Sequence, residues 1–229
     1  MSRSPSMRPV SFPVTHELSG WELFWVRLEI LPVSSSNREE ALAALRRQAG
    51  ERARAEWSLE TLSADSTVAA VRSLFRAAGC DPTRYRPSSE ALLRRLLKGE
   101  ELPAIHPFVD LNNCLSVTLA VPACVAAEGS FTPPVTLRAG RPGESYESLR
   151  GPFNLEGKPL LADRDGAFGT PITDSQRVKV TGDTRRAWMV AYLPAGVVTA
   201  EAAEKVLQDL LIAAPAARME EAGASGGGR

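Results

Sequence analysis

The chain has 229 residues, of which 44% are hydrophobic and 24% are charged. This length and composition are typical of a globular protein that buries a hydrophobic core without disulfide staples. With 27 basic and 27 acidic residues, the chain lacks the excess positive charge of proteins that bind nucleic acid tightly and unspecifically, although a local basic patch could still contact RNA.

The cysteines and histidines are too few and too scattered to predict a disulfide framework or a metal site. Cys80, Cys114 and Cys124 have no C-x-x-C spacing, and an odd number of cysteines fits a reducing compartment. Only His16 and His106 are available as histidine ligands. We therefore expect no zinc site and no cofactor.

No targeting or membrane-spanning segment is expected. Residues 1–9 contain two arginines but no apolar stretch of the kind found in secretory signals. No run reaches the roughly 20 apolar residues of a transmembrane helix. The sequence therefore predicts a cytoplasmic protein without membrane contact. Residues 1–9 and the glycine-rich end, residues 216–229, are expected to be disordered tails.

The segment 10–82 is predicted to form one strand followed by helices. Residues 21–30 alternate apolar and charged side chains, which is typical of a half-buried strand. Residues 38–57 and 66–78 have helical apolar spacing, and Gly79 is a typical stop signal for the second helix.

A second unit is predicted over residues 83–215, beginning with a helix between Pro87 and Gly99. Arg94, Arg95 and Lys98 lie on or beside the polar side of this helix. These cations form either a solvated helix face or part of an RNA-binding surface.

Residues 107–119 predict a mostly buried helix that is opened by a proline in its first turn. Asn112, Asn113 and Ser116 interrupt its apolar surface. Such groups must either bond to nearby loops or line a polar cavity, and both interpretations stay open.

The segment from residue 121 to residue 194 is predicted to consist of short strands and turns. The strand candidates are residues 135–139, 145–149, 159–162, 176–181 and 187–193. Residues 199–213 then form an amphipathic helix that is expected to lie on the sheet. The predicted class is α+β, with a helical N-terminal half packed on a mainly antiparallel sheet.

Common catalytic motifs do not occur, including G-x-G-x-x-G, the P-loop, H-E-x-x-H and G-x-S-x-G. A Ser-His-Asp triad would need His16 or His106. His16 lies in a Pro- and Ser-rich segment that is a poor place for a rigid base, and His106 is the better candidate, although a lone histidine at a helix entry is usually structural. The segment I-T-D-S-Q-R is a better candidate. Its residues Thr173, Asp174 and Ser175 form either a polar turn or a pocket rim that holds a polar substrate and orients a water molecule.

Four segments, in this order, resemble a known domain: P-F-V-D-L-N-N-C-L-S, L-R-A-G-R-P-G-E-S-Y-E-S-L-R-G, L-L-A-D-R-D-G and I-T-D-S-Q-R-V-K-V-T-G-D-T-R-R-A. Together with the helix before them they resemble the free-standing form of the B3/B4 domain of the phenylalanyl-tRNA synthetase beta subunit. In the synthetase this domain hydrolyses tyrosine that is wrongly attached to the phenylalanine tRNA. The resemblance implies a B3/B4-like fold and a pocket for the aminoacylated 3′ end of a tRNA.

The resemblance also places this chain's residues on the synthetase pattern. The Pro-Met-His-like stretch of the synthetase domain becomes Pro122-Ala123-Cys124 here, so Cys124 replaces its histidine. The later Gly-Gly-Glu segment falls near residues 173–175, where Asp174 is the nearest acid. These departures put the amino-acid specificity in doubt.

For a hydrolase of this kind the candidate residues fall into three sets. The catalytic candidates are Asp174, Thr173 and Ser175. The substrate-pocket candidates are Asn112, Asn113, Ser116, Cys124 and Glu144. The RNA-binding candidates are Arg84, Arg86, Arg94, Arg95, Lys98, Arg185 and Arg186.

Three functions follow as hypotheses. The first is a trans-acting aminoacyl-tRNA editing hydrolase that cleaves mischarged tRNA with a positioned water. The second is a non-catalytic module that binds tRNA or another RNA, and the third is a protein that binds or hydrolyses a small molecule such as an amino acid. The expected partner is tRNA, a synthetase is a second candidate partner, and the sequence leaves the oligomeric state undetermined.

Overall fold

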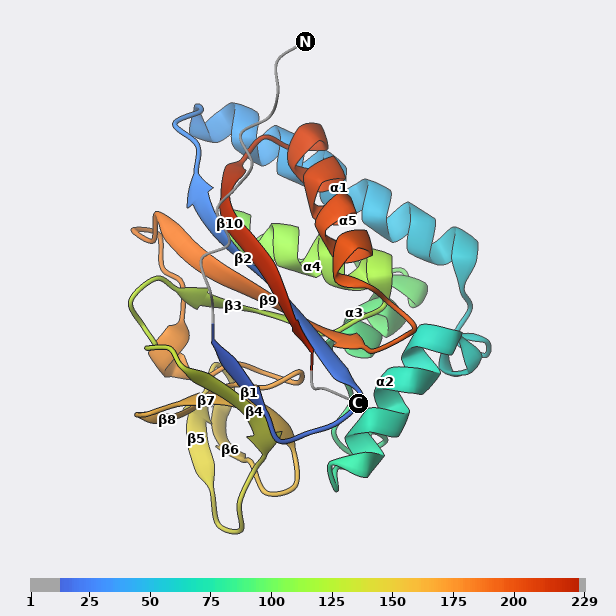
Figure 1. Cartoon of the computed structure of the whole chain (residues 1–229). Helices are drawn as coiled ribbons and strands as arrows, with labels where there is room; N and C mark the ends of the chain where they lie inside the picture. Colours follow the sequence, from blue (N-terminus) through green and yellow to red (C-terminus); the bar gives the residue numbers. More distant parts are fainter. Residues whose placement is uncertain (1–12, 227–229) are drawn as a thin grey trace.

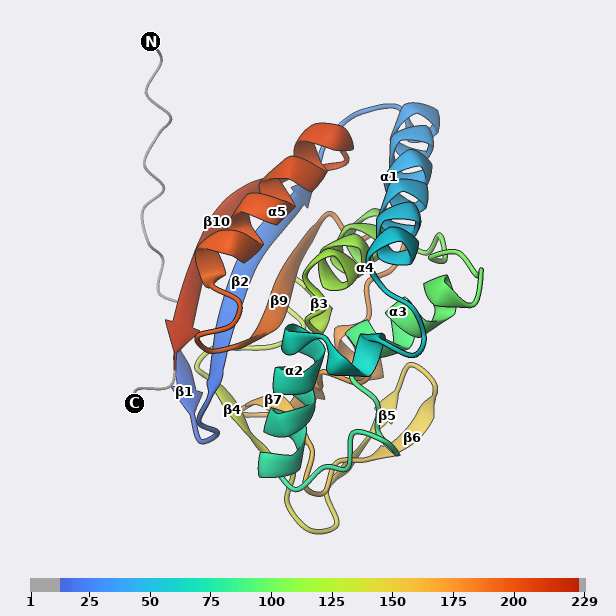
Figure 2. The same ribbon diagram turned by 90° about the vertical axis from the view of Figure 1, so that its right-hand side faces the viewer.

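The computed structural model describes residues 13–226. A sheet with strand order β10-β2-β9-β3 lies between a layer of helices and a second sheet of order β1-β4-β7-β8 (Figures 1 and 2). The strands of the first sheet, β2 (Trp21–Ile30), β3 (Ala123–Ala127), β9 (Arg186–Pro194) and β10 (Ala217–Gly226), all pair antiparallel.

The second sheet contains β1 (Val14–His16), β4 (Val135–Ala139), β7 (Pro159–Asp163) and β8 (Gly166–Gly169). Its pair β1–β4 is parallel, whereas β4–β7 and β7–β8 are antiparallel. The strands β5 (Ser145–Ser148) and β6 (Gly151–Asn154) form a separate antiparallel hairpin beside this sheet.

The helical layer covers one face of the first sheet. Helix α4 (Pro107–Leu119) packs on β3 and β9, and α5 (Ala200–Ala213) packs on β2 and β10. Outside them, α1 (Ser35–Glu56) contacts α4 and α3 (Ser88–Leu97), as Figure 2 shows. Helix α2 (Ser66–Ala77) instead contributes Val71 and Phe75 to the core on the other side of the sheet.

The alternation of β2 separates two cores. Phe24, Val26 and Leu28 belong to the core under the helices, whereas Trp21, Leu23 and Trp25 belong to the core shared with the second sheet. The prediction of a half-buried strand was therefore wrong, because both faces of β2 are covered. The Arg27 guanidinium within the strand does not lack counter-charges, since it pairs with Glu128, Glu220 and Glu221.

Most predicted elements are confirmed within two or three residues at each end, including each of the five predicted α-helices. The predicted strand at residues 176–181 was wrong, because this segment begins with the 3-10 helix η2 (Gln176–Val178). The Ser175 hydroxyl accepts a hydrogen bond from the Arg177 N–H at 3.2 Å, and this cap favours a helical turn over an extended chain.

The C-terminal segment was predicted to be a disordered tail over residues 216–229, and this was wrong for its described part. Residues 217–226 form β10, which pairs with β2 along its whole length. Because β2 is central in a sheet whose other strands follow residue 120, the structure also does not separate residues 13–82 from the predicted unit 83–215. The predicted tail at residues 1–9 lies outside the described residues.

The α+β class with mainly antiparallel sheets is confirmed. Within residues 13–226, no helix has the length and apolar character needed to span a bilayer. Cys80, Cys114 and Cys124 are buried and unpaired.

Candidate functional site

The loop that follows β8 brings Asp174 to the open edge of β3. Strand β3 is at the end of its sheet and pairs only with β9, so its other edge is open. The Tyr192 N–H donates to the Pro122 carbonyl oxygen, so the backbone groups of Pro122 and of every second residue after it face β9. By alternation, the backbone groups of Ala123 and Val125 point toward the open edge. The Val125 N–H donates to Asp174 there.

The polar helix reaches the same strand edge from the opposite layer. Asn112 Nδ2, on α4, donates to the Ala123 carbonyl oxygen at 3.3 Å. Asn112 and Asp174, which are distant in sequence, therefore bind neighbouring backbone groups of one edge strand. Asn112 Oδ1 and Asp174 Oδ1 are both enclosed and have no hydrogen-bond partner among residues 13–226. Buried polar atoms without partners are rare, and they are a reason to look for a functional site.

Three polar side chains gather beside Gly169. A Cβ atom built on Gly169 would lie 3.4 Å from Asp174 Oδ1 and 3.7 Å from both Cys124 Sγ and the Tyr192 hydroxyl. The Cys124 thiol and the Tyr192 hydroxyl are also 3.7 Å apart. Cys124 and Tyr192 belong to the core shared with the second sheet, so they face away from α4. We call Gly169 and these three side chains the Gly169 site.

A tyrosine and a threonine hold the Asp174 loop in place. The Tyr146 hydroxyl donates to the Thr173 carbonyl oxygen at 2.6 Å, and the Thr170 hydroxyl donates to the same oxygen at 2.6 Å. The Thr173 N–H in turn donates to the Thr170 hydroxyl at 3.0 Å. These bonds fix the backbone of Thr173, immediately before Asp174.

The protonation of the Gly169 site is set by burial. Enclosure raises the pKa of Asp174 to about 8, and the single N–H of Val125 only partly opposes this shift. Burial also raises the pKa of the Cys124 thiol well above its ordinary value, and the nearby Asp174 carboxyl raises it further. Cys124 is therefore a thiol at neutral pH and a poor nucleophile.

Three predicted site residues make their hydrogen bonds elsewhere. Ser116 Oγ donates to the Val121 carbonyl oxygen at 2.7 Å. Glu144 accepts from Arg138 Nη2 at 2.6 Å and from Nη1 at 2.8 Å, and this pairing holds the pKa of Glu144 below its ordinary value. Ser175 caps η2. Asn113 is buried within the helical layer, and we find no contact that brings it to the Gly169 site.

The predicted RNA-binding cations fall into two groups. Arg84, Arg86, Arg94, Arg95 and Lys98 lie before, on or at the end of α3. Arg185 and Arg186 lie at the start of β9, where Arg186 Nη2 pairs with Glu29 Oε1 at 3.0 Å and Arg186 Nε pairs with Glu220 Oε2 at 3.4 Å. Arg95 pairs with Glu100 at 3.0 Å. Arg186 and Arg95 are thus already neutralised by carboxylates.

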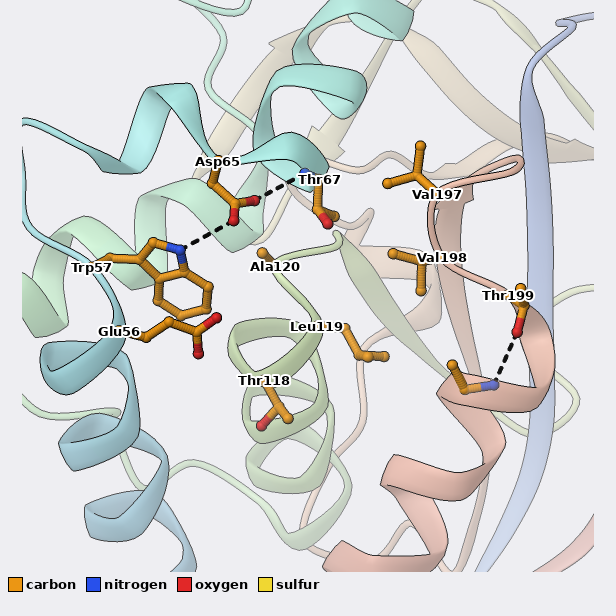
Figure 3. Close-up of a pocket in the computed structure, with 11 residues that line it drawn as sticks. Glu56, Trp57, Asp65, Thr67, Thr118, Leu119, Ala120, Val197, Val198 and Thr199 are labelled. Carbon is orange, nitrogen blue, oxygen red and sulfur yellow. Dashed lines mark hydrogen bonds between the residues drawn. The ribbon is translucent and has the colours of Figure 1, made fainter.

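A hollow of about 350 Å³ lies away from the Gly169 site, between the ends of α1, α2, α4 and α5 (Figure 3). Its walls include Trp57, Leu119 and Val198, and its charged groups are Glu56 and Asp65. No predicted site residue lines it, and no basic side chain lines it. Two carboxylates without a cation disfavour a phosphate-bearing ligand, so we do not assign the tRNA end to this hollow.

Sequence reasoning missed Gly169, Tyr192 and Tyr146. A tyrosine in an otherwise apolar strand needs a hydroxyl partner, and this was the available signal for Tyr192. Gly169 offered no local signal beyond its residue type. Within residues 13–226, no group of three or more His, Cys, Asp or Glu side chains could hold a metal ion.

The comparisons with known proteins give a family. A family profile described as the B3/4 domain matches residues 70–209, which is more than half of the chain. The curated proteins contain no match. Among solved structures, an N-terminal fragment of the phenylalanyl-tRNA synthetase beta subunit from Pyrococcus horikoshii is similar with a TM-score of 0.45 and 14% sequence identity.

That alignment covers 94% of this chain and 52% of the synthetase fragment, so this chain spans about half of the fragment's length. The assignment rests on the profile match, which includes α3, the polar helix α4, β3, the Asp174 loop and β9. The chain belongs to the B3/4 domain family.

Proposed function

We propose that this protein hydrolyses the ester bond of mischarged aminoacyl-tRNA with a positioned water. One observation carries the proposal: polar atoms of Asp174, Cys124 and Tyr192 converge on the point that a Cβ atom of Gly169 would occupy. Asp174 and Cys124 are the residues that the resemblance to the synthetase domain aligns with its acidic segment and its histidine. Hydrolysis of an activated ester depends on position and on hydrogen-bond donors, and it does not require a covalent intermediate.

Asp174 is the proposed general base. With a pKa of about 8, roughly a tenth of the carboxyl groups are ionised at pH 7, and this poise near the working pH suits proton transfer. The ionised carboxylate would accept a proton from the attacking water. The Tyr192 hydroxyl, beside the same point, would donate a hydrogen bond that orients this water or the reacting carbonyl oxygen.

Cys124 is proposed to shape the pocket and to take no covalent part. The residue is 3% exposed and burial raises the pKa of its thiol, so little thiolate forms near neutral pH. The bond from Asn112 to the Ala123 carbonyl would keep the edge of β3 in register with the Asp174 loop.

The experiment is a hydrolysis assay with purified protein and a panel of tRNAs charged with wrong amino acids. The proposal expects at least one of them to be deacylated faster than in buffer, and it expects Asp174→Asn to abolish the difference. A panel left intact at micromolar protein would defeat the hydrolase proposal.

A non-catalytic RNA-binding module is the second candidate, and the enclosure of Asp174 Oδ1 favours it. If water cannot reach the Asp174 carboxyl group, this group cannot act as the general base for hydrolysis. This candidate predicts salt-sensitive RNA binding without turnover. Its decisive result is equal RNA affinity in wild type and Asp174→Asn, with every tRNA in the panel left intact by both proteins.

A further inference from the structure

A buried glutamate holds three arginines beside the candidate site. Glu90, in the first turn of α3, is 1% exposed. Arg72 Nη1 lies 2.9 Å from Glu90 Oε2, and Arg94 Nε lies 2.9 Å from Oε1. Arg86 Nε approaches Oε1 at 3.5 Å. We call these four residues the Glu90 cluster.

The Glu90 cluster carries more positive than negative charge. One carboxylate faces three guanidinium groups, so two positive charges remain uncompensated within the cluster. Within residues 13–226, we find no carboxylate other than Glu90 paired with Arg72, Arg86 or Arg94. Surplus guanidinium charge held in one place attracts anions.

The geometry of the cluster leaves donors available. Arg86 and Arg94 meet Glu90 through Nε, and each guanidinium carries four further N–H donors on its two Nη atoms. The Arg86 and Arg94 side chains are 42% and 27% exposed, whereas Glu90 is enclosed. Paired N–H groups of this kind match the oxygens of a phosphate.

The cluster adjoins the Asp174 loop through residues 85–88. The Ser88 N–H donates to the Pro171 carbonyl oxygen at 2.9 Å. The ring of Tyr85 lies 6.1 Å from that of Phe153, which stacks on Tyr146. Tyr146 in turn bonds to Thr173. In the sequence, Arg86 lies between Tyr85 and Ser88, which make the first two of these contacts.

We propose that the Glu90 cluster is a phosphate-binding site for the backbone of single-stranded RNA that enters the Gly169 site. The inference rests on the proposed function for the identity of the RNA, whose 3′ end would carry the ester. In this role Glu90 does not contact the RNA. It positions Arg86 and Arg94 so that their free N–H groups face the backbone, and Arg72, which also donates to Thr83, adds positive charge from the more enclosed side of the cluster.

Glu90→Gln distinguishes an organised phosphate site from a basic surface that attracts RNA through its charge alone. The substitution removes a negative charge, so a diffuse surface would bind RNA more tightly. An organised site would bind more weakly, because the arginines lose the group that orients them. Arg94→Lys makes the matched comparison, since it keeps the charge but loses the paired donors.

The test is fluorescence anisotropy with the labelled tetraribonucleotide ACCA, measured across a range of salt concentrations. We expect Arg86→Gln/Arg94→Gln to weaken binding by about tenfold or more and to reduce the log–log salt slope by roughly one to two. Arg94→Lys and Glu90→Gln should each weaken binding several-fold. Arg52→Gln, which changes an exposed arginine of α1, is the control and should bind like wild type.

Three results would overturn the inference: a double variant that binds within twofold of the control, tighter binding by Glu90→Gln, or undiminished binding of a methylphosphonate ACCA that lacks backbone charge. Thermal melting checks the fold of Glu90→Gln, and Arg94→Lys decides the question if that variant does not fold. Failure of the proposed function is a separate outcome, because cluster-dependent RNA binding without hydrolysis of any mischarged tRNA would leave this inference standing.

Discussion

Asp110 is buried at the entrance to α4, and at the open edge of β3 the Oδ1 atom of Asp174 is enclosed although the residue as a whole is partly exposed. The surroundings treat the two carboxyl groups differently. Asp110 Oδ1 accepts from the Ile105 N–H at 3.0 Å and the His106 N–H at 3.4 Å, and its Oδ2 pairs with Arg46 Nη1. Asp174 accepts one backbone N–H, from Val125, and its Oδ1 has no partner within residues 13–226.

This difference separates a structural carboxylate from a candidate functional one. Burial raises the pKa of both groups, but the N–H donors and Arg46 oppose the shift at Asp110. At Asp174 a single N–H opposes it, and the pKa reaches about 8. A buried carboxyl group short of partners costs stability, and such perturbed groups cluster at functional sites.

The largest expected effect is the loss of folding stability when Asp110, whose two carboxyl oxygens both have partners, is replaced. Asp110→Ala leaves Arg46, whose side chain is 10% exposed, without its buried partner. We expect a loss of about 3–5 kcal/mol in the free energy of unfolding, measured by urea denaturation. Glu39→Ala is the matched control, because Glu39 binds the same arginine but its side chain is 59% exposed. This control should cost less than about 1 kcal/mol, and equal losses in the two variants would contradict the distinction.

Replacing Asp174 should have the opposite effect and raise the free energy of unfolding. The folded-state pKa of Asp174, about 8, lies above the ordinary value near 3.9. Between these values the unfolded chain releases a proton that the folded protein keeps, so folding stability falls as the pH rises through this window. Asp174→Asn removes this penalty.

We therefore expect the stability advantage of Asp174→Asn over wild type to grow by on the order of 2 kcal/mol between pH 5 and pH 7. Urea denaturation at the two pH values measures it. The same variant should lose hydrolysis, which is the pattern of a residue kept for function at a cost in stability. An advantage that does not change with pH would show that the Asp174 carboxyl is not held protonated.

The neighbouring thiol should matter less. Cys124→Ala removes one buried sulfur and should cost about 1 kcal/mol. Hydrolysis should persist at a similar rate, because the thiol is not the nucleophile in the proposed reaction. Denaturation and the tRNA assay measure the two effects. Complete loss of hydrolysis in a folded Cys124→Ala, together with a trapped covalent intermediate in wild type, would reassign the chemistry to Cys124.

The sequence could predict elements whose signals are local. Helix α2 was expected at residues 66–78 and is Ser66–Ala77, because apolar spacing and a glycine with φ of 95° at position 79 define it. Strand β10 was beyond such reasoning. Its sequence, A-R-M-E-E-A-G-A-S-G, has only short alternating stretches of small residues that are interrupted by a register shift after Met219, and it is a strand because β2 offers it an open edge.

The same limit applies to the two aspartates. Asp110 lies between Val109 and Leu111, and Asp174 lies between Thr173 and Ser175. Neither neighbourhood shows which carboxyl group finds hydrogen-bond partners in the folded protein. Asp110 is satisfied by Arg46, which is 64 positions away in the chain. Asp174 was selected with its neighbours from a dense polar run, but the convergence of Cys124, Tyr192 and Gly169 on it depends on how β3, β8 and β9 pack. Residue type could suggest the acid, and only tertiary structure could supply its partners.

The smallest expected change in stability carries the sharpest test of the Gly169 site. Gly169 does not have a left-handed backbone, and a Cβ at this position would meet its neighbours at 3.4–3.7 Å, which is ordinary contact. Gly169→Ala should therefore fold, and its free energy of unfolding should rise by about 0.5 kcal/mol, because the substitution reduces the conformational freedom of the unfolded chain.

The added methyl group would occupy the point on which Asp174, Cys124 and Tyr192 converge. If a water or the substrate carbonyl uses that point, hydrolysis should fall by at least about tenfold, which corresponds to roughly 1.4 kcal/mol in the activation barrier. RNA affinity should stay unchanged, because the Glu90 cluster is untouched. Gly182→Ala, at an exposed glycine where a Cβ meets no atom within 4 Å, is the control. Full activity in a folded Gly169→Ala would place the reaction elsewhere in the molecule.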